Sequence, residues 1–328
     1  MARSPLTLAA VAAAAVPGLE ATHVGLLDEP DFDAAAITGA DGRHWRIRVP
    51  RNQRAETDLG AELVALAALT PGARARLPFD VVEVAGQQRF GPTRAVVTTY
   101  PYGDRVRLAD IPTAPDGLGA AIGRAIGAIH ALPTAVVTEA GLRVSGPGEA
   151  RRSAVSVLDR TVATGLLPAA VQARWEQAID DADLWQFQPV VTGGGLDGDS
   201  FRAQGTDVVS VDGWKGLSIG DPAVDLKWVV QSERVADAVF AGYAAVAGTG
   251  DRRLRHRSAL LSELDLGRWL LHGIEEQRTD IVDDAVELLT TLAERVHGDL
   301  SARIDAPTAP VLTLTEVEDL LDRAQQAV

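Results

Sequence analysis

The sequence contains no cysteine and only two lysines, Lys215 and Lys227, among its 328 residues. Without cysteine the chain can form neither a disulfide framework nor a thiolate metal site, which suits a cytoplasmic protein. The formal net charge of -14 is the opposite of what nucleic-acid binding requires, so we expect no DNA or RNA partner. No stretch approaches the ~20 apolar residues of a membrane span, so we expect no membrane partner either.

Apolar residues make up 46% of the sequence, which is enough to form the core of one large domain or two medium domains. Alternating apolar residues with a turn at residues 40–43 predict a hairpin that ends in HWRIRVPR. Leucines at helical spacing predict a helix over residues 56–69, and an apolar stripe stopped by Pro133 predicts another over residues 118–132. The alanine-rich residues 6–16 are interpreted as a first helix rather than as a signal peptide.

The most informative stretch is residues 190–228, VVTGGGLDGDSFRAQGTDVVSVDGWKGLSIGDPAVDLKW. It predicts two short strands joined by a turn, followed by a loop that closes with DPAVDL. The stretch resembles the catalytic hairpin of the aminoglycoside and macrolide phosphotransferases, small-molecule kinases in which H-G-D-L-x-x-x-N precedes I-D-W and then D-P-A-x-D-L. WRIRVPR at residues 45–51 and AIHALP at residues 128–133 resemble the macrolide 2'-phosphotransferase branch most closely.

The resemblance implies an α+β, two-lobed protein-kinase-like fold. Residues 1–100 would form a small N-lobe on the nucleotide side, with an antiparallel sheet and one main helix. Residues 101–328 would form a larger, mostly helical C-lobe with the catalytic hairpin and the acceptor-side helices. Trp214, Asp221 and Asp225 match the family and would have structural roles.

On the nucleotide side, the resemblance puts Arg48 in the place of the kinase lysine that holds the nucleotide phosphates, with Glu62 as its partner. A solvated helix charge is the alternative interpretation of Glu62. Tyr100 and Tyr102 fall at the hinge between the lobes, where the family binds the nucleotide. The turn at residues 25–33 carries four acids, the opposite of the positive potential that a phosphate cradle requires.

The family's catalytic side chains are missing. Its histidine falls on Gly193, its catalytic aspartate on Gly195, its asparagine on Ser200 and its metal-binding aspartate on Gly213. Glycine has no side chain and can neither accept a proton nor bind a metal. The scaffold is therefore expected to be retained while the chemistry is lost or altered.

Three nearby acids are candidate replacements: Asp197 and Asp199 for the base, and Asp212 for the metal ligand. Asp197 lies two residues from Gly195, ~6.6 Å along an extended chain, whereas a base must lie ~2.6–3.2 Å from its proton. Asp212 directly precedes Gly213, so in a strand its side chain points to the other face. The glycine run at residues 193–195 permits a shift in register, so these acids either form a residual site or only solvate a loop.

A second HGDL occurs at residues 297–300, but it ends a long helical pattern and lacks the following asparagine and strand. A motif without its structural context is interpreted as chance.

The leading hypothesis is a pseudo-phosphotransferase, catalytically impaired or inactive, that binds a small apolar or cationic molecule in the C-lobe cleft and needs no cofactor. The alternative is an active phosphotransferase of a small-molecule hydroxyl that uses the shifted acids with ATP or GTP and Mg²⁺. A protein-interaction scaffold is the third hypothesis. The sequence does not determine the oligomeric state.

Overall fold

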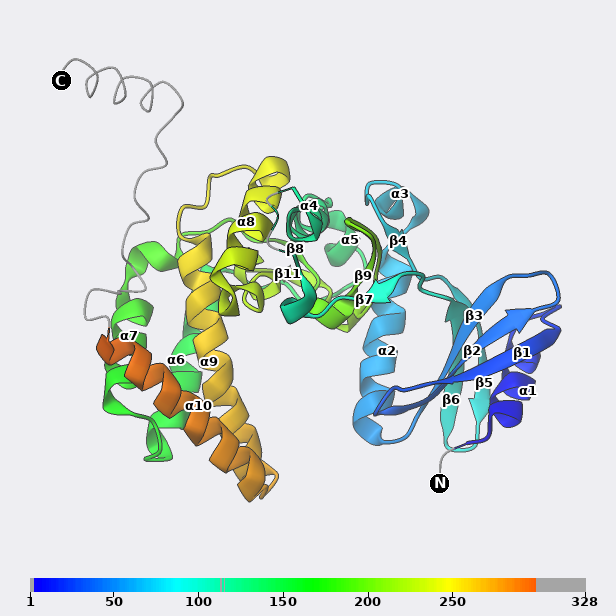
Figure 1. Cartoon of the computed structure of the whole chain (residues 1–328), viewed down its shortest axis with the longest axis horizontal. Helices are drawn as coiled ribbons and strands as arrows, with labels where there is room; N and C mark the ends of the chain where they lie inside the picture. The colour runs from blue at the N-terminus through cyan, green and yellow to red at the C-terminus, as the bar shows by residue number, and fades with distance from the viewer. Residues whose placement is uncertain (1–2, 113, 115, 299–328) are drawn as a thin grey trace, which may run out of the picture.

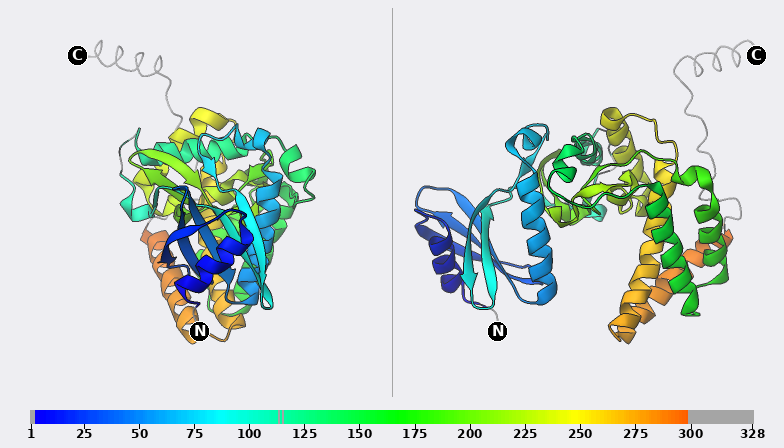
Figure 2. Two further views of the ribbon diagram at one scale, coloured as in Figure 1. Left: turned by 90° about the vertical axis from the view of Figure 1, so that its right-hand side faces the viewer. Right: turned by 180° about the vertical axis from the view of Figure 1, so that it is seen from behind.

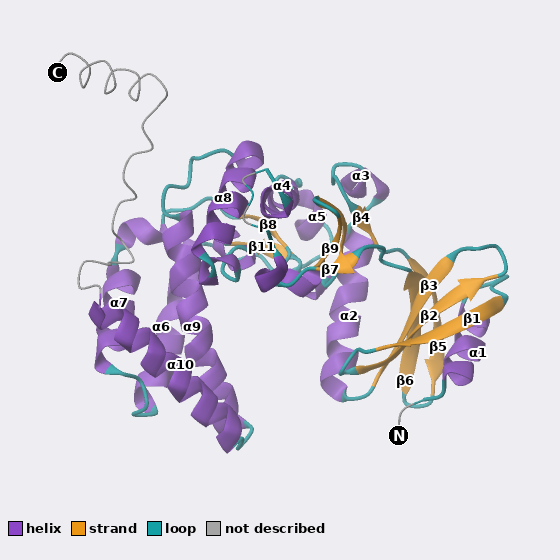
Figure 3. Cartoon of the chain, viewed as in Figure 1, coloured by secondary structure: helices purple, strands orange, loops and turns teal. Residues whose placement is uncertain are grey.

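The computed structural model describes residues 3–112, 114 and 116–298. Two lobes lie side by side along the long axis of the molecule (Figure 1). Most of the strands belong to the N-terminal lobe and most of the helices to the C-terminal lobe (Figure 3). The α+β, two-lobed fold expected from the sequence is thereby confirmed.

The N-lobe is built on a five-stranded antiparallel sheet with the strand order β1-β2-β3-β6-β5. Its elements are α1 (Pro5–Ala15), β1 (Ala21–Leu27), β2 (Phe32–Gly39), β3 (His44–Pro50), α2 (Gln53–Ala68), α3 (Pro71–Arg74), β5 (Val84–Phe90) and β6 (Thr93–Thr99). Helices α1 and α2 lie on opposite sides of this lobe (Figures 1 and 2).

Strand β3 explains how the site is positioned. Successive side chains of a strand point to opposite faces. Trp45, Ile47 and Val49 belong to the apolar cluster that packs with α1. The intervening Arg46 and Arg48 therefore point to the other face, toward α2 and the C-lobe, where both are buried.

The C-lobe holds most of the core. Its helices are α4 (Leu118–His130), α5 (Ala135–Thr138), α6 (Pro147–Ala163), α7 (Ala169–Asp180), α8 (Glu233–Ala247), α9 (Leu254–Glu275) and α10 (Thr279–Gly298). Helices α4 and α8 pack closely because small residues meet. A Cβ added to Gly123 would lie 2.0 Å from the carbonyl oxygen of Val239, and one added to Gly242 would lie 2.1 Å from that of Ala120.

Two small sheets carry the predicted hairpin. One has the order β4-β10-β9-β7, and β11 pairs with β8 in the other. Their strands are β4 (Asp80–Val81), β7 (Asp104–Arg105), β8 (Val190–Thr192), β9 (Phe201–Gln204), β10 (Asp207–Val211) and β11 (Ser218–Gly220). Strands β9 and β10 form the antiparallel hairpin expected from the sequence. Strand β4 follows the N-lobe helices and pairs in parallel with β10, which links the two lobes through their backbones.

Among the described residues, no helix combines the length and the apolar character that a membrane crossing requires. The second HGDL begins at the end of α10. Its last two residues, Asp299 and Leu300, lie outside the described residues.

Candidate functional site

The glycine run at residues 193–195, where the sequence resemblance puts the family's catalytic motif, is held by one carboxylate. Asp225 accepts hydrogen bonds from the backbone N–H groups of Gly193 at 2.7 Å, Gly195 at 2.7 Å and Leu196 at 3.0 Å. Its Oδ2 also lies 3.1 Å from Nε2 of His130. Burial by itself raises the pKa of a carboxyl, yet His130 and the backbone donors outweigh burial and lower the pKa of Asp225. Asp225 therefore holds the backbone of the glycine loop in place.

His130, at the end of α4, also contacts the hydroxyl of Tyr243 on α8, 3.0 Å from its Nδ1. The imidazole is thus enclosed between a carboxylate and a phenol and is buried. A second brace joins Asp221 to the fully buried Arg257 of α9, at 2.9 Å and 3.0 Å. Both aspartates of the DPAVDL segment hold the loop to the helices of the C-lobe.

At the position of the family's catalytic aspartate, Gly195 has φ +104°, and a Cβ there would meet nothing within 4 Å. Asp197 does not reach this position, because it caps the short turn Gly198–Ser200. Its Oδ1 accepts hydrogen bonds from the backbone N–H of Ser200 at 3.1 Å and from its hydroxyl at 3.0 Å. Asp199 is exposed and makes no hydrogen bond or ion pair with another described side chain. Asp225 contacts Gly195 through the backbone N–H, but no described carboxylate lies within 4 Å of the point where a Cβ of this residue would stand.

At the position of the family's metal-binding aspartate, Gly213 is left-handed with φ +79°. The preceding Asp212 is buried and binds Arg46 of β3 with both oxygens, at 2.5 Å and 3.0 Å. Burial opposes the charge of Asp212, but Arg46, Arg48 and Arg202 outweigh it and hold the pKa of this carboxyl well below its usual range.

The guanidinium of Arg46 therefore joins the N-lobe sheet to the C-lobe, and Glu29 lies 3.8 Å from its Nη1. Arg48 donates a hydrogen bond of 2.8 Å to Glu62 of α2, and its guanidinium lies 5.3 Å from the ring centre of Phe32. The sequence prediction named Arg48 and Glu62 but missed Arg46. The signal was present, because two arginines separated by one residue on a strand share a face.

A second inter-lobe contact joins Lys215 to Asp58 of α2 at 2.6 Å. Lys215 lies in the short turn Trp214–Gly216, which follows directly on Gly213. The indole of Trp214 is fully buried and donates a hydrogen bond of 3.0 Å to the carbonyl oxygen of Val211.

The two hinge tyrosines line an outer groove. Tyr102 is exposed and makes edge contacts with Tyr100, 5.7 Å away, and with His44, 6.0 Å away. Together with Trp45 and Val16, the tyrosines line a cavity of ≈ 490 Å³.

The C-lobe contains a cavity of ≈ 450 Å³ beside the glycine run and the DPAVDL segment. Leu142, Leu217 and Leu261 supply apolar lining, and several hydroxyls face it as well, among them those of Ser145 and Ser153. This volume is within the range of small-molecule sites. It lies where the resemblance puts the acceptor cleft.

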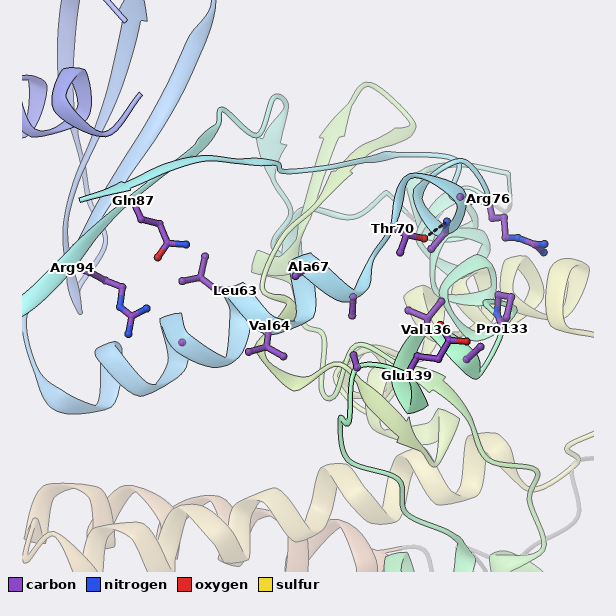
Figure 4. Close-up of a pocket in the computed structure, with 16 residues that line it drawn as sticks. Leu63, Val64, Ala67, Thr70, Arg76, Gln87, Arg94, Pro133, Val136 and Glu139 are labelled. Atoms are coloured by element: carbon purple, nitrogen blue, oxygen red, sulfur yellow. Dashed lines mark hydrogen bonds between the residues drawn. The ribbon is translucent and has the colours of Figure 1, made fainter. Parts of the chain in front are cut away.

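A larger cavity of ≈ 860 Å³ lies between α2 and α5 (Figure 4). Leu63 and Val64 of α2 line one side, and Pro133 and Val136 line the other. None of the predicted site residues takes part in this cavity.

A magnesium nucleotide, which the resemblance implies, does not fit the residues present. Glycines stand at both acidic positions, and Asp212 is already bound to Arg46. Within the described part of the chain, no group of three or more His, Cys, Asp or Glu side chains could hold a metal ion.

The sequence matches no protein-family model and no curated protein. Solved structures, however, share the fold. Macrolide 2'-phosphotransferase MphH from Brachybacterium faecium, solved as the apoenzyme, aligns with a TM-score of 0.74 at 19% identity over 87% of this chain and 98% of that one. A type I macrolide 2'-phosphotransferase gives 0.69 at 22% identity, over 88% of this chain and 98% of that one. An aminoglycoside phosphotransferase in complex with GDP and kanamycin gives 0.70 at 18% identity, over 88% and 99%. The chain therefore has the kinase-like fold of the macrolide and aminoglycoside phosphotransferases.

Proposed function

We propose that this chain is a pseudo-phosphotransferase that no longer transfers phosphate and instead binds a small molecule in the C-lobe cleft. The observation that carries the proposal is the buried ion pair between Arg46 of the N-lobe and Asp212 of the C-lobe. In active enzymes of this type, carboxylates and an asparagine hold Mg²⁺ on the phosphates there. Here Asp212, the carboxylate next to Gly213, is instead paired with Arg46 of the protein itself.

The alternative of shifted acids finds less support. Asp197 is used as a turn cap and Asp212 as the partner of Arg46, so each would have to give up an existing contact to act. Of the three candidate acids, Asp199 alone is exposed and makes no hydrogen bond or ion pair with another described side chain. One carboxylate cannot supply both the base and the metal ligands that phosphoryl transfer requires.

The intact C-lobe supports the binding role. Both aspartates of DPAVDL hold the loop beside the ≈ 450 Å³ cavity in a fixed position. The leucines and hydroxyls of the cavity suit a ligand with an apolar body and hydroxyl groups, such as a macrolide. Charged residues line the same cavity and could contact a charged group of the ligand: Arg143, Glu149, Lys215, Asp221 and Arg268.

The test is a thermal-shift and calorimetric screen of macrolides, kanamycin and hydroxylated natural products, in the absence of nucleotide. Ser153 of α6 lines the cavity, whereas the equally exposed Ser156 of the same helix does not. We expect a saturable increase in Tm for the wild-type protein and for Ser156→Trp, and its loss in Ser153→Trp. If no compound stabilises the wild type, or if both variants respond alike, the proposal is wrong.

A further inference from the structure

Helix α2 has a second apolar face besides the one that it buries in the N-lobe. Its buried residues are Ala55, Leu59, Glu62, Ala65 and Leu66. A second stripe runs along the helix at the spacing of one helical face and consists of Gly60, Leu63, Val64, Ala67 and Ala68. Val64, in the middle of this stripe, is 48% exposed. A surface helix that carries apolar residues on its outer face as well is typical of a docking surface.

The second stripe forms one wall of the ≈ 860 Å³ cavity between α2 and α5 (Figure 4). Pro133 and Val136 stand on the opposite wall, so the cavity is a groove with two apolar sides. Charged side chains mark its ends: Arg94 lies at one end, and Arg76 and Glu139 lie at the other (Figure 4). The groove therefore suits a partner that is apolar on one face and carries mainly negative charge on the other.

The end of the chain has this character. Residues 313–328, outside the described residues, have the sequence TLTEVEDLLDRAQQAV. Apolar residues recur there at every third or fourth position, as Leu314, Val317, Leu321, Ala324 and Val328. The charged residues fall between them and are Glu316, Glu318, Asp319, Asp322 and Arg323. The pattern predicts an acidic amphipathic helix.

The groove and this segment match in apolar pattern and in charge. Amphipathic helices bind other proteins by laying their apolar face in such a groove. The acids of the segment would meet Arg76 and Arg94, and its arginine would meet Glu139. Helix α10, which precedes the segment, ends at the end of the C-lobe that lies away from α2 (Figures 1 and 2). This position directs the segment to the groove of another molecule.

We propose that residues 313–328 of one copy bind as a helix in the groove between α2 and α5 of a second copy. Two copies that exchange these segments form a closed dimer with two identical contacts. Each contact removes the apolar face of the segment and the outer stripe of α2 from water, which favours association. The inference goes beyond the proposed function and does not depend on it, because the groove contains no residue of the C-lobe cavity.

The experiment measures the molar mass of the full-length protein by sedimentation and light scattering over a range of concentrations. Val64→Glu puts a charge into the groove, and Leu321→Glu puts one on the apolar face of the segment. The controls are Val246→Glu, at a valine of α8 that is 45% exposed and lies outside the groove, and Gln326→Glu on the polar face of the segment. We expect a concentration-dependent dimer in the wild type and both controls. The Kd of the dimer should be about ten-fold to a hundred-fold weaker in Val64→Glu and in Leu321→Glu.

A mixture of the two weakened variants shows whether the groove and the segment meet each other. Val64→Glu keeps an intact segment and Leu321→Glu keeps an intact groove, so a mixed dimer retains one of the two contacts. We expect the mixture to associate more tightly than either variant alone. A mixture that associates no better than its components would overturn the proposal, as would a wild type that is monomeric at every concentration. Equal weakening by the controls would overturn it as well.

Discussion

Arg46 of the N-lobe and Asp212 of the C-lobe are joined by two hydrogen bonds, of 2.5 Å and 3.0 Å, and both residues are buried. This pair crosses the space between the lobes, where the fold's active members carry out phosphoryl transfer. The same pair sets the stability, the pH dependence and the nucleotide affinity that we expect for the protein.

Removing Arg46 should be strongly destabilising, because Asp212 would remain as a buried, unpaired charge. We expect Arg46→Met to lower the free energy of unfolding by about 3–5 kcal/mol in urea titrations. The control is Arg43→Met, whose pair with Asp41 is exposed to solvent and should contribute far less than the buried pair. The double variant Arg46→Met/Asp212→Leu should recover most of the loss. Equal effects of Arg46→Met and Arg43→Met would mean that the buried pair does not form.

Acid should weaken the protein through the same carboxylate. The pKa of Asp212 is lower in the folded protein than in the unfolded chain, so its ionised form adds stability above about pH 4. That contribution is lost as the pH falls toward the folded-state pKa, by about 1.4 kcal/mol for each pH unit. The free energy of unfolding, followed from pH 6 to pH 2.5, should fall less in Asp212→Asn than in the wild type. Parallel curves would contradict the assignment.

Asp225 should be essential for the glycine loop. It accepts three backbone N–H groups and is fully buried, so Asp225→Ala would leave those donors unpaired. We expect a loss of about 3 kcal/mol or more in the free energy of unfolding. Asp199→Ala, an exposed acid nearby, should change it by less than about 0.5 kcal/mol. A loss in Asp225→Ala no larger than that of the control would show that the loop is held by other contacts.

Replacing either of two helical glycines with alanine should change the stability of the protein, in opposite directions at the two positions. At Gly60 of α2 a Cβ meets nothing within 4 Å, so Gly60→Ala should stabilise the protein by about 0.5–1 kcal/mol. At Gly123 of α4 the Cβ would lie 2.0 Å from the carbonyl oxygen of Val239, so α4 and α8 must separate and about 1–3 kcal/mol or more is lost. Thermal unfolding of the two variants measures both effects, and a Tm for Gly123→Ala at or above the wild-type value would refute the close helix contact.

The sequence was sufficient for the fold because local patterns and long motifs pointed the same way. The β9–β10 hairpin, the helix α2 and the DPAVDL segment each carry a strong signal within one short stretch of sequence. The resemblance also implied the partnership of Arg48 with Glu62, which the structure contains at 2.8 Å.

The sequence could not supply contacts between distant segments. Arg46 and Asp212 are separated by 166 positions, and no local pattern couples them. The same holds for His130 with Asp225. Asp212 was predicted as a candidate metal ligand from its place beside Gly213. That role remains a prediction. In the folded chain Asp212 is bound to Arg46, so a metal ion would have to displace this arginine.

The most direct test of the central claim is calorimetric titration of the full-length protein with ATP and GTP, each with and without Mg²⁺. The claim predicts no magnesium-dependent binding to the wild type, and none to Gly195→Asp/Gly213→Asp, because Asp212 is still paired with Arg46. Nucleotide binding is expected to appear first in the triple variant, in which Arg46→Ala is added to these two substitutions. Saturable, magnesium-dependent binding of either nucleotide to the wild-type protein would contradict the claim. It would support the alternative hypothesis of an active phosphotransferase.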